Sequence, residues 1–335
     1  MYDFLHLPCS PQKQLSECFT VHPASPPFRL SAVHACYNPV ESIIQTAYNT
    51  DINLQCNTYS HFNKSHQNKE DTMIQINKEL CIGCGECVKD CPVFCISITD
   101  HKASASGDCM NCGHCAAICP KEAVSIPGYD MDDVEIYDKT TFSLEADTLL
   151  RAIKFRRSIR DYKPLPIEKE KLQKVLQAGR YTATAKNNQD CHFIFVQKEL
   201  AALKQQVWDF IQDYANSHID NTSEDMLPYL SFNQRRKADC KDDYLFRNAP
   251  VVAYITSDWP LDAGLAAQNM ELMAVSLGLG VLYNGYLARI TNANEKLKDW
   301  LGIKGKTIKA CMLLGYPNVS YERTAPRKEA NVIWK

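Results

Sequence analysis

The sequence lacks an excess of either charge and lacks any long apolar run. Its 37 Lys and Arg residues nearly balance 39 Asp and Glu residues, so the formal net charge is −2 at pH 7. There is no dense basic run to neutralise phosphates and no acidic tail, which argues against a nucleic-acid partner. No stretch approaches the roughly 18 apolar residues of a membrane span. We therefore expect neither nucleic-acid binding nor a membrane segment.

The N-terminal region also lacks the features of a targeting segment. No charged region leads into an apolar one, and Lys13 and Arg29 are the only basic residues among the first 30. Residues 1–72 show no sustained periodicity and are rich in Ser, Asn, His, Pro and Thr, which predicts a disordered extension. An early start codon is an alternative origin for this segment. The expected compartment is the cytosol, where thiols stay reduced.

What the sequence has in excess is cysteine. Nine of its 16 cysteines lie within residues 81–119, and eight of these belong to a repeated motif. A secreted disulfide scaffold spreads its cysteines through a short chain that cannot bury enough apolar surface. Here 335 residues with 45% apolar content are enough for more than one domain with a core. In a reducing compartment, such a block indicates metal binding or redox chemistry.

The cysteine block, predicted to span residues 73–130, contains the same motif twice. Cys-x2-Cys-x2-Cys-x3-Cys-Pro occurs at 81–92 and again at 109–120. This spacing is typical of [4Fe-4S] clusters, in which the fourth cysteine of each motif binds the other cluster. We assign one cluster to Cys81, Cys84, Cys87 and Cys119, and the other to Cys109, Cys112, Cys115 and Cys91. Zinc is the weaker alternative, because zinc sites usually take their cysteines as two separated pairs.

The block resembles the two-[4Fe-4S] ferredoxins of bacteria, and the resemblance implies a domain that relays single electrons. Gly83, Gly85 and Gly113 suit loops whose N–H groups must approach the sulfides closely. Cys95 lies outside the repeat, and we interpret it as a small buried apolar residue. Residues 131–147, with several acidic side chains, are predicted to form a linker.

Residues 148–335 alternate helical and strand patterns, which predicts an α+β domain. Helices are expected at 168–180, 199–217 and 262–278. The last of these is apolar almost all round and is therefore expected to lie centrally in the core. Gly179 is expected to mark the end of the first. β-branched and aromatic residues predict strands at 192–197, 250–256, 281–287 and 307–314.

A cluster of arginines opens this domain. Arg156, Arg157, Ser158 and Arg160 place three guanidinium groups and a hydroxyl close together, which suits phosphate, although such clusters are more often solvated. The cluster is followed by Ala-Thr-Ala-Lys-Asn-Asn-Gln at 183–189, Phe-Arg-Asn-Ala-Pro-Val-Val at 246–252, Asp-Ala-Gly-Leu-Ala-Ala-Gln-Asn at 262–269 and Gly-Tyr-Pro at 315–317. With these motifs in this order, the domain resembles the FMN-dependent nitroreductase family.

That resemblance implies a homodimer with one FMN per subunit. The residues it places around FMN are Arg156, Arg157, Ser158, Arg160, Asn187, Gln189, Asn284, Gly285 and Arg327. The five arginine and serine positions would hold the phosphate and ribityl chain, with Arg327 closing from the C-terminal segment. Asn187 and Gln189 would line the flavin, and the Asn284-Gly285 pair would lie near the reactive ring edge. A tight bend in a strand is an equal alternative for Gly285.

One segment departs from the family pattern. Many relatives carry Pro and an aromatic after the glutamine, whereas this chain has Asp190-Cys191-His192. Asp190 is expected either to alter polarity near the site or to face solvent, which leaves the substrate open. His192 is predicted to begin a strand and not to be a proton donor. The sequence assigns no catalytic side chain.

The two halves together predict an oxidoreductase. Electrons would pass from a donor, reduced ferredoxin or NAD(P)H, through two [4Fe-4S] clusters to FMN and on to nitroaromatic, quinone or related acceptors. Such a fusion converts a one-electron supply into two-electron reduction, and its layout resembles fusions found in anaerobes. The alternatives are an electron carrier or redox sensor without turnover, and a flavin reductase that acts on a non-nitro substrate.

Overall fold

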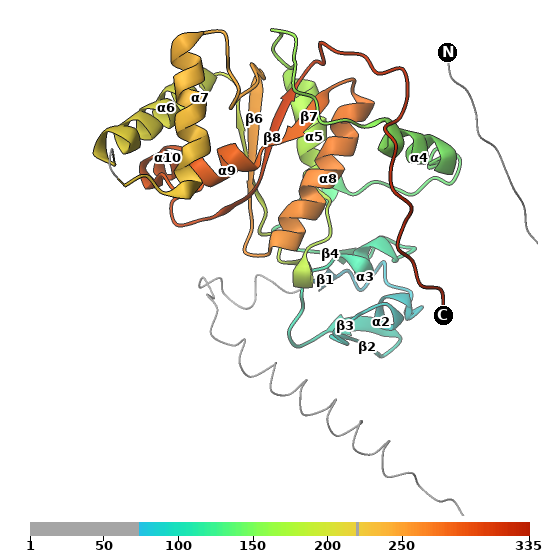
Figure 1. Ribbon diagram of the computed structural model, residues 1–335. Helices are drawn as coiled ribbons and strands as arrows, with labels where there is room; N and C mark the ends of the chain where they lie inside the picture. Colours follow the sequence, from blue (N-terminus) through green and yellow to red (C-terminus); the bar gives the residue numbers. More distant parts are fainter. Residues whose placement is uncertain (1–73, 219–220) are drawn as a thin grey trace, which may run out of the picture. The chain divides into compact units, whose positions relative to one another are not determined.

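A computed structural model describes residues 74–218 and 221–335, all of which belong to one compact unit of the chain (Figure 1). The predicted extension at 1–72 lies outside the described residues. The described part is α+β, as the sequence predicts. Within it, no helix is long and apolar enough to cross a membrane.

The cysteine block is built from short elements around two small antiparallel sheets. These elements are β1 (Gln75–Ile76), α2 (Glu86–Lys89), β2 (Ile96–Thr99), β3 (Lys102–Ala105), α3 (His114–Ala117) and β4 (Val124–Ser125). β1 pairs with β4, and β2 pairs with β3. α2 and α3 each follow a glycine with φ of 80°, Gly85 and Gly113, a backbone conformation that favours glycine. The two copies of the sequence motif therefore form matching turns and helices.

The elements after β4 include three short 3-10 helices, labelled η, among α-helices and strands. They are η1 (Met131–Asp133), α4 (Ala146–Phe155), α5 (Lys169–Arg180), η2 (Ala185–Asn187), β5 (His192–Val196), α6 (Leu200–Ser217), η3 (Glu224–Met226), α7 (Leu227–Ala238), β6 (Val251–Thr256), α8 (Pro260–Ser276), β7 (Gly280–Tyr283), α9 (Gly285–Asn292), α10 (Glu295–Trp300) and β8 (Ile308–Gly315). The predicted strands at 192–197, 250–256 and 307–314 are confirmed to within two residues, as are the predicted helices.

A four-stranded antiparallel sheet with strand order β5-β6-β8-β7 forms the centre of this domain (Figure 1). One of its two central strands, β6, is buried along its whole length. Val251, Ala253 and Ile255 pack with residues of α5 and α8, whereas Val252 and Tyr254 pack with residues of α6, α7 and α9. This alternation follows from the two-residue period of a strand. The sheet therefore has one hydrophobic core on each face.

The predicted strand at 281–287 is wrong in its second half. β7 ends at Tyr283, and α9 begins at Gly285. The Asn284 side chain accepts a hydrogen bond from the Leu287 backbone N–H at 2.9 Å, which caps the new helix. The apolar and aromatic residues around this position favoured a strand, but the asparagine cap ends it. Gly285 is thus the first residue of a helix and not a bend in a strand.

Two further expectations are corrected by packing. Gly179 does not end its helix, because α5 continues to Arg180. A Cβ on Gly179 would lie 2.8 Å from Phe193 and 2.9 Å from the Met270 sulfur, so the glycine permits close packing. α8 is not buried all round either. Leu261 and Leu265 on this helix are 70% and 44% exposed, so only the opposite face belongs to the core.

Candidate functional site

The structure gathers the eight motif cysteines into two groups. Cys81, Cys84, Cys87 and Cys119 line one cavity, which we call the first cavity. Cys91, Cys109, Cys112 and Cys115 line a second cavity together with Cys95. Each cavity thus combines three cysteines of one motif with the fourth cysteine of the other. Their role as iron ligands stays a prediction.

Backbone N–H groups point at the sulfurs in both cavities. In the first cavity, Ala103 donates to Cys81 Sγ and Ala123 donates to Cys119 Sγ, both at 3.3 Å. In the second cavity, Asn111 donates to Cys109 Sγ at 3.3 Å. The N–H of Ala103, followed by that of Gly83, lowers the pKa of the Cys81 thiol, because these donors stabilise a thiolate. Such donors suit sulfurs that bind iron, and the cysteines present at both cavities are therefore the ligands that [4Fe-4S] clusters require.

The cysteines could alternatively hold a single metal ion such as zinc, which requires ligands placed close together. Within residues 74–218 and 221–335, no group of three or more His, Cys, Asp or Glu side chains is placed to hold a metal ion. Sulfurs that share one zinc ion lie about 2.3 Å from it and hence close together, whereas the sulfurs around four irons surround a larger body.

The arginine cluster lies beside the edge strand of the large sheet. Ser158 forms a parallel bridge with Val281, and the Ile159 N–H donates to the Val281 carbonyl at 2.9 Å. These bonds hold the segment after α4 against β7. The Arg156 guanidinium lies 3.1 Å from the carboxylate of Glu271, a residue of α8 whose side chain is only 2% exposed. In this structure Arg156 therefore pairs with a buried carboxylate.

The other members of the cluster point in different directions. Arg157 donates to the Lys154 and Arg156 carbonyls and, at 3.4 Å, to the Arg323 carbonyl of the C-terminal segment. Arg327, on the same C-terminal segment, is exposed and donates to the neighbouring Pro326 carbonyl. The structure thus brings the C-terminal segment to Arg157, but it does not gather all the predicted phosphate-binding arginines at one point.

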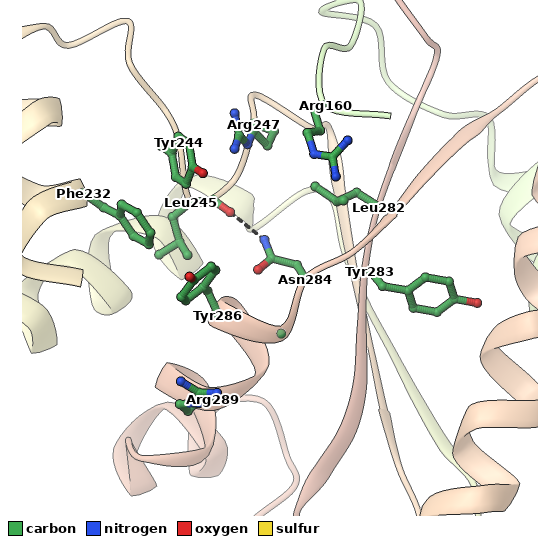
Figure 2. A pocket seen from close by; sticks show the side chains of 11 residues that line it. Arg160, Phe232, Tyr244, Leu245, Arg247, Leu282, Tyr283, Asn284, Tyr286 and Arg289 are labelled. Atoms are coloured by element: carbon green, nitrogen blue, oxygen red, sulfur yellow. Dashed lines mark hydrogen bonds between the residues drawn. The ribbon is translucent and has the colours of Figure 1, made fainter. Parts of the chain in front are cut away.

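A cavity of about 390 Å³ lies where β7 meets α9 (Figure 2). Of the predicted flavin residues, Arg160, Asn284 and Gly285 line it. Two residues to which the sequence assigns no role add positive charge: Arg247, within the motif at 246–252, and Arg289. None of the described residues that line the cavity carries a carboxylate. The cavity therefore favours an anionic ligand.

Aromatic side chains form one wall of this cavity. Phe232, Tyr244 and Tyr286 lie together in Figure 2, with ring centroids of Phe232 4.7 Å from Tyr244 and 5.2 Å from Tyr286. The Arg247 guanidinium lies 3.7 Å from the centroid of the Tyr244 ring. Flat apolar surface beside cationic groups suits a planar ligand that carries negative charge.

Asn284 has a structural task in this wall. Its amide nitrogen donates to the Leu245 carbonyl at 2.6 Å, drawn as the dashed line in Figure 2, while its oxygen caps α9. The side chain thereby joins the loop before β6 to the start of α9. Gly285 follows as the first residue of the helix, where backbone N–H groups are not used within the helix.

Asn187 and Gln189 do not line this cavity. Asn187 donates from its side-chain amide to the Asn111 carbonyl at 2.9 Å, and Gln189 donates to the Tyr129 hydroxyl at 2.8 Å. Asn111 lies between Cys109 and Cys112 of the second cavity. The loop predicted to line the flavin therefore contacts the cysteine block.

Five of the ten non-glycine residues with left-handed backbone in the described part of the chain lie in the loop at 186–189 and in the loop before β6. Lys186 and Asn187 have φ of 54°, Gln189 has φ of 50°, and Arg247 and Asn248 have φ of 55° and 54°. Such conformations are costly for L residues and are retained mainly at sites whose surroundings determine them, often functional ones.

The departing segment at 190–192 has local roles. Asp190 is half-buried and accepts hydrogen bonds from the Ser257 hydroxyl at 3.0 Å and the Asp258 N–H at 2.6 Å. It therefore fixes the turn before α8. His192 begins β5, as predicted, and its ring contacts the Lys306 ammonium at 2.5 Å on the exposed surface.

Two family models match the chain. Residues 153–316 match the nitroreductase family, and residues 80–123 match a 4Fe-4S dicluster domain. The two matched ranges contain the arginine cluster, the cavity and all eight motif cysteines.

Known proteins are similar to the C-terminal half. A protein of Archaeoglobus fulgidus, named provisionally an NADH dehydrogenase/NAD(P)H nitroreductase, is 29% identical over 50% of this chain and 84% of its own length. The NADPH-flavin oxidoreductase of Vibrio harveyi is 25% identical over 55% of this chain and 71% of its own. Among solved structures, a nitroreductase with bound FMN from Bacteroides fragilis is 21% identical, covers 56% of this chain and 98% of its own, and has a TM-score of 0.45.

The class of this protein follows from both matches: it is a redox protein in which a 4Fe-4S dicluster domain precedes a nitroreductase domain. The chain is an oxidoreductase of the nitroreductase family, with the family domain at residues 153–316. The sequence resemblance to both families is thereby confirmed.

Proposed function

We propose that this protein passes electrons from reduced ferredoxin or NAD(P)H through two [4Fe-4S] clusters to FMN and on to nitroaromatic, quinone or related acceptors. The observation that carries the proposal is the contact between the two halves. The side chain of Asn187 bonds the backbone of Asn111, which lies between two cysteines of the second cavity. A bound cluster and the nitroreductase domain would therefore be neighbours.

The two cysteine cavities would hold the clusters. Each offers four thiols from the two motifs, and backbone N–H groups donate to sulfurs in both. Cys84 is exposed, whereas Cys81 and Cys87 are buried. An exposed cysteine at the first cavity supports this cavity as the point where electrons enter from outside.

The arginine-lined cavity would hold FMN. This cofactor takes up and releases electrons singly or in pairs, which links clusters to acceptors that need two electrons. Arg160 and Arg247 would stabilise negative charge on a planar ring, and the aromatic wall would cover one side of it. The first backbone N–H groups of α9 would lie at the ring edge. Arg157, which contacts the C-terminal segment, and Arg327, which lies on that segment, would reach the phosphate.

Two exposed apolar helix faces support a homodimer. α4 buries none of its residues, although Leu150, Ile153 and Phe155 give it an apolar face. Leu261 and Leu265 leave the outer face of α8 apolar as well. We propose that these faces meet in a homodimer. Sedimentation of the holoprotein is expected to give twice the mass of one chain, and a concentration-independent monomer would contradict this.

The experiment that tests the function is anaerobic purification followed by cofactor counting and turnover. We expect eight irons and one flavin per chain, and oxidation of the reduced protein by a nitroaromatic or a quinone. Reduction is then compared with NAD(P)H and with dithionite-reduced ferredoxin as donors. Tightly bound FMN without oxidation by any acceptor would favour the alternative, an electron carrier or redox sensor. Arg160→Met is expected to weaken FMN binding about tenfold, since one charged hydrogen bond contributes about 1.5 kcal/mol.

A further inference from the structure

The fourth cysteines of the two motifs accept corresponding hydrogen bonds. Four residues after the fourth cysteine of each motif, a backbone N–H donates to that cysteine's sulfur. Cys95 donates to Cys91 Sγ at 3.4 Å, and Ala123 donates to Cys119 Sγ at 3.3 Å. Both side chains are buried, with 6% and 3% exposure. Cys95 and Ala123 therefore occupy corresponding positions, one at each cavity.

The two positions differ in chemistry. The Cys95 sulfur lies 3.6 Å from the Cys91 sulfur, within hydrogen-bond distance for two sulfur atoms, and Cys95 lines the second cavity. Ala123 lines the first cavity with a methyl group, which cannot donate. The structure thus adds a side-chain thiol to one cavity and not to the other.

The direction of this hydrogen bond would follow from the ligand chemistry. With a cluster bound, Cys91 would be a thiolate that can only accept, so the S–H of Cys95 would be the donor. Hydrogen bonds to the sulfurs are among the factors that set cluster potentials. A donor stabilises the more negative, reduced state more than the oxidised state, and it therefore raises the potential.

We propose that Cys95 is a tuning residue, whose thiol raises the reduction potential of the cluster bound by Cys91, Cys109, Cys112 and Cys115. This inference rests on the proposed presence of two clusters. It does not depend on FMN or on the acceptor. Because the loop of the second cavity contacts Asn187, the thiol would favour electrons at the cavity next to the nitroreductase domain.

Other charges act on the first cavity. The Lys102 ammonium donates to the Cys81 carbonyl at 2.5 Å, and the Lys78 ammonium donates to the carbonyl of Ala103. Positive charge also raises a reduction potential. A comparison of the two cluster potentials in the unmodified protein would therefore not separate the effect of the Cys95 thiol from that of the lysines. Exchanging the side chains at positions 95 and 123 does separate the two effects.

The test uses the full-length holoprotein and three substitutions. Cys95→Ala copies the first cavity into the second, Ala123→Cys does the reverse, and Cys95→Ser keeps a donor. The two cluster potentials are measured by redox titration followed by electron paramagnetic resonance, after iron and sulfide are counted in each variant. The count separates the two proposals, because a wild-type protein without eight irons would contradict the proposed function.

We expect Cys95→Ala to lower one of the two potentials and to leave the other unchanged. The expected change is at least threefold in the distribution of an electron between the clusters, or about 28 mV for a one-electron couple. Cys95→Ser is expected to lie closer to the wild type. Ala123→Cys is expected to raise the other potential.

Three results would overturn the proposal. The first is a fully loaded Cys95→Ala protein with both potentials unchanged. The second is an equal shift of both potentials, which would indicate a general structural effect. The third is loss of one cluster from both Cys95→Ala and Cys95→Ser, because the thiol would then hold the cluster in place of tuning it.

Discussion

In the cysteine block, three of the four motif cysteines at each candidate cavity come from one short segment, whereas in the nitroreductase domain the arginines of the cavity come from segments far apart. Cys81, Cys84 and Cys87 reach the first cavity from a single loop and helix. Arg160, Arg247 and Arg289 reach theirs from three different segments. A local site depends on the spacing of ligands, and a distributed site depends on the sheet that brings its segments together.

The difference also concerns what stabilises each region. The core of the cysteine block includes Cys81, Cys87, Cys91 and Cys115 themselves. The nitroreductase domain instead has two apolar cores, one on each face of its sheet. Loss of clusters is therefore expected to affect the structure of the first region much more than that of the second, since structural metal binding contributes directly to folding.

The largest expected effect is that of Cys84→Ser. This exposed cysteine can be replaced with little packing cost, and we expect loss of one cluster and of donor-driven reduction. Direct chemical reduction of FMN should persist, because the flavin cavity lies in the other region. Cys240→Ser, also at an exposed cysteine, is the matched control and should leave both reactions intact. Equal loss of both reactions would show that the clusters are structural only.

The next largest effect is a difference in stability between substitutions at Gly83 and Gly85, two glycines of one loop. A Cβ on Gly83 would lie 2.2 Å from the His101 carbonyl oxygen, whereas a Cβ on Gly85 would meet nothing within 4 Å. Both have positive φ, so Gly85→Ala is expected to cost about 1–2 kcal/mol of stability. Gly83→Ala adds about 1–3 kcal/mol of overpacking and should reduce the iron content. The measurements are iron content and thermal unfolding, and equal effects of the two substitutions would contradict a steric clash at Gly83.

A third effect lies in the nitroreductase domain. Arg156→Met leaves the buried Glu271 carboxylate without its guanidinium partner, and we expect a loss on the order of 3 kcal/mol. Adding Glu271→Gln should recover most of this stability, since no charge is then left buried. Arg157→Met is the control, because the hydrogen bonds of Arg157 go to backbone carbonyls and its guanidinium lies over the Tyr321 ring, so its loss leaves no buried carboxylate unpaired. Chemical denaturation gives the stabilities, and additive effects of the two substitutions would disprove the pairing.

The same variants also test whether Arg156 binds the flavin phosphate. Flavin affinity of the Arg156→Met, Glu271→Gln double variant reports phosphate binding without the cost of the unpaired carboxylate. An affinity equal to that of Glu271→Gln alone would mean that Arg156 is a structural residue.

The smallest effect is expected from truncation. A chain that begins at Met73 should keep its iron, its flavin and its activity, because the described elements begin after this position. Iron and flavin counts of the shortened protein check the expectation. Loss of folding would show that residues 1–72 contribute to the regions compared above.

Sequence patterns predicted some elements of the nitroreductase domain well and others badly. The strand predicted at 250–256 is present as β6 (Val251–Thr256), because a run of apolar and β-branched residues strongly favours a strand. α9 was missed, because its start depends on one asparagine that caps the helix within an apolar stretch. Arg289 on that helix was missed with it. Gly179 was misinterpreted, because its contacts with Phe193 and Met270 come from distant segments.

The sequence by itself determined the two cysteine motifs, the order of the family motifs and the α+β class of the protein. These depend on spacing and periodicity, which short-range geometry imposes. Only the tertiary structure decided that Arg156 pairs with Glu271, that Arg247 and Arg289 join Arg160, and that Cys95 faces Cys91 where Ala123 faces Cys119. Each of these depends on which residues the folded chain brings within a few ångströms of one another, and a local sequence pattern does not predict such contacts.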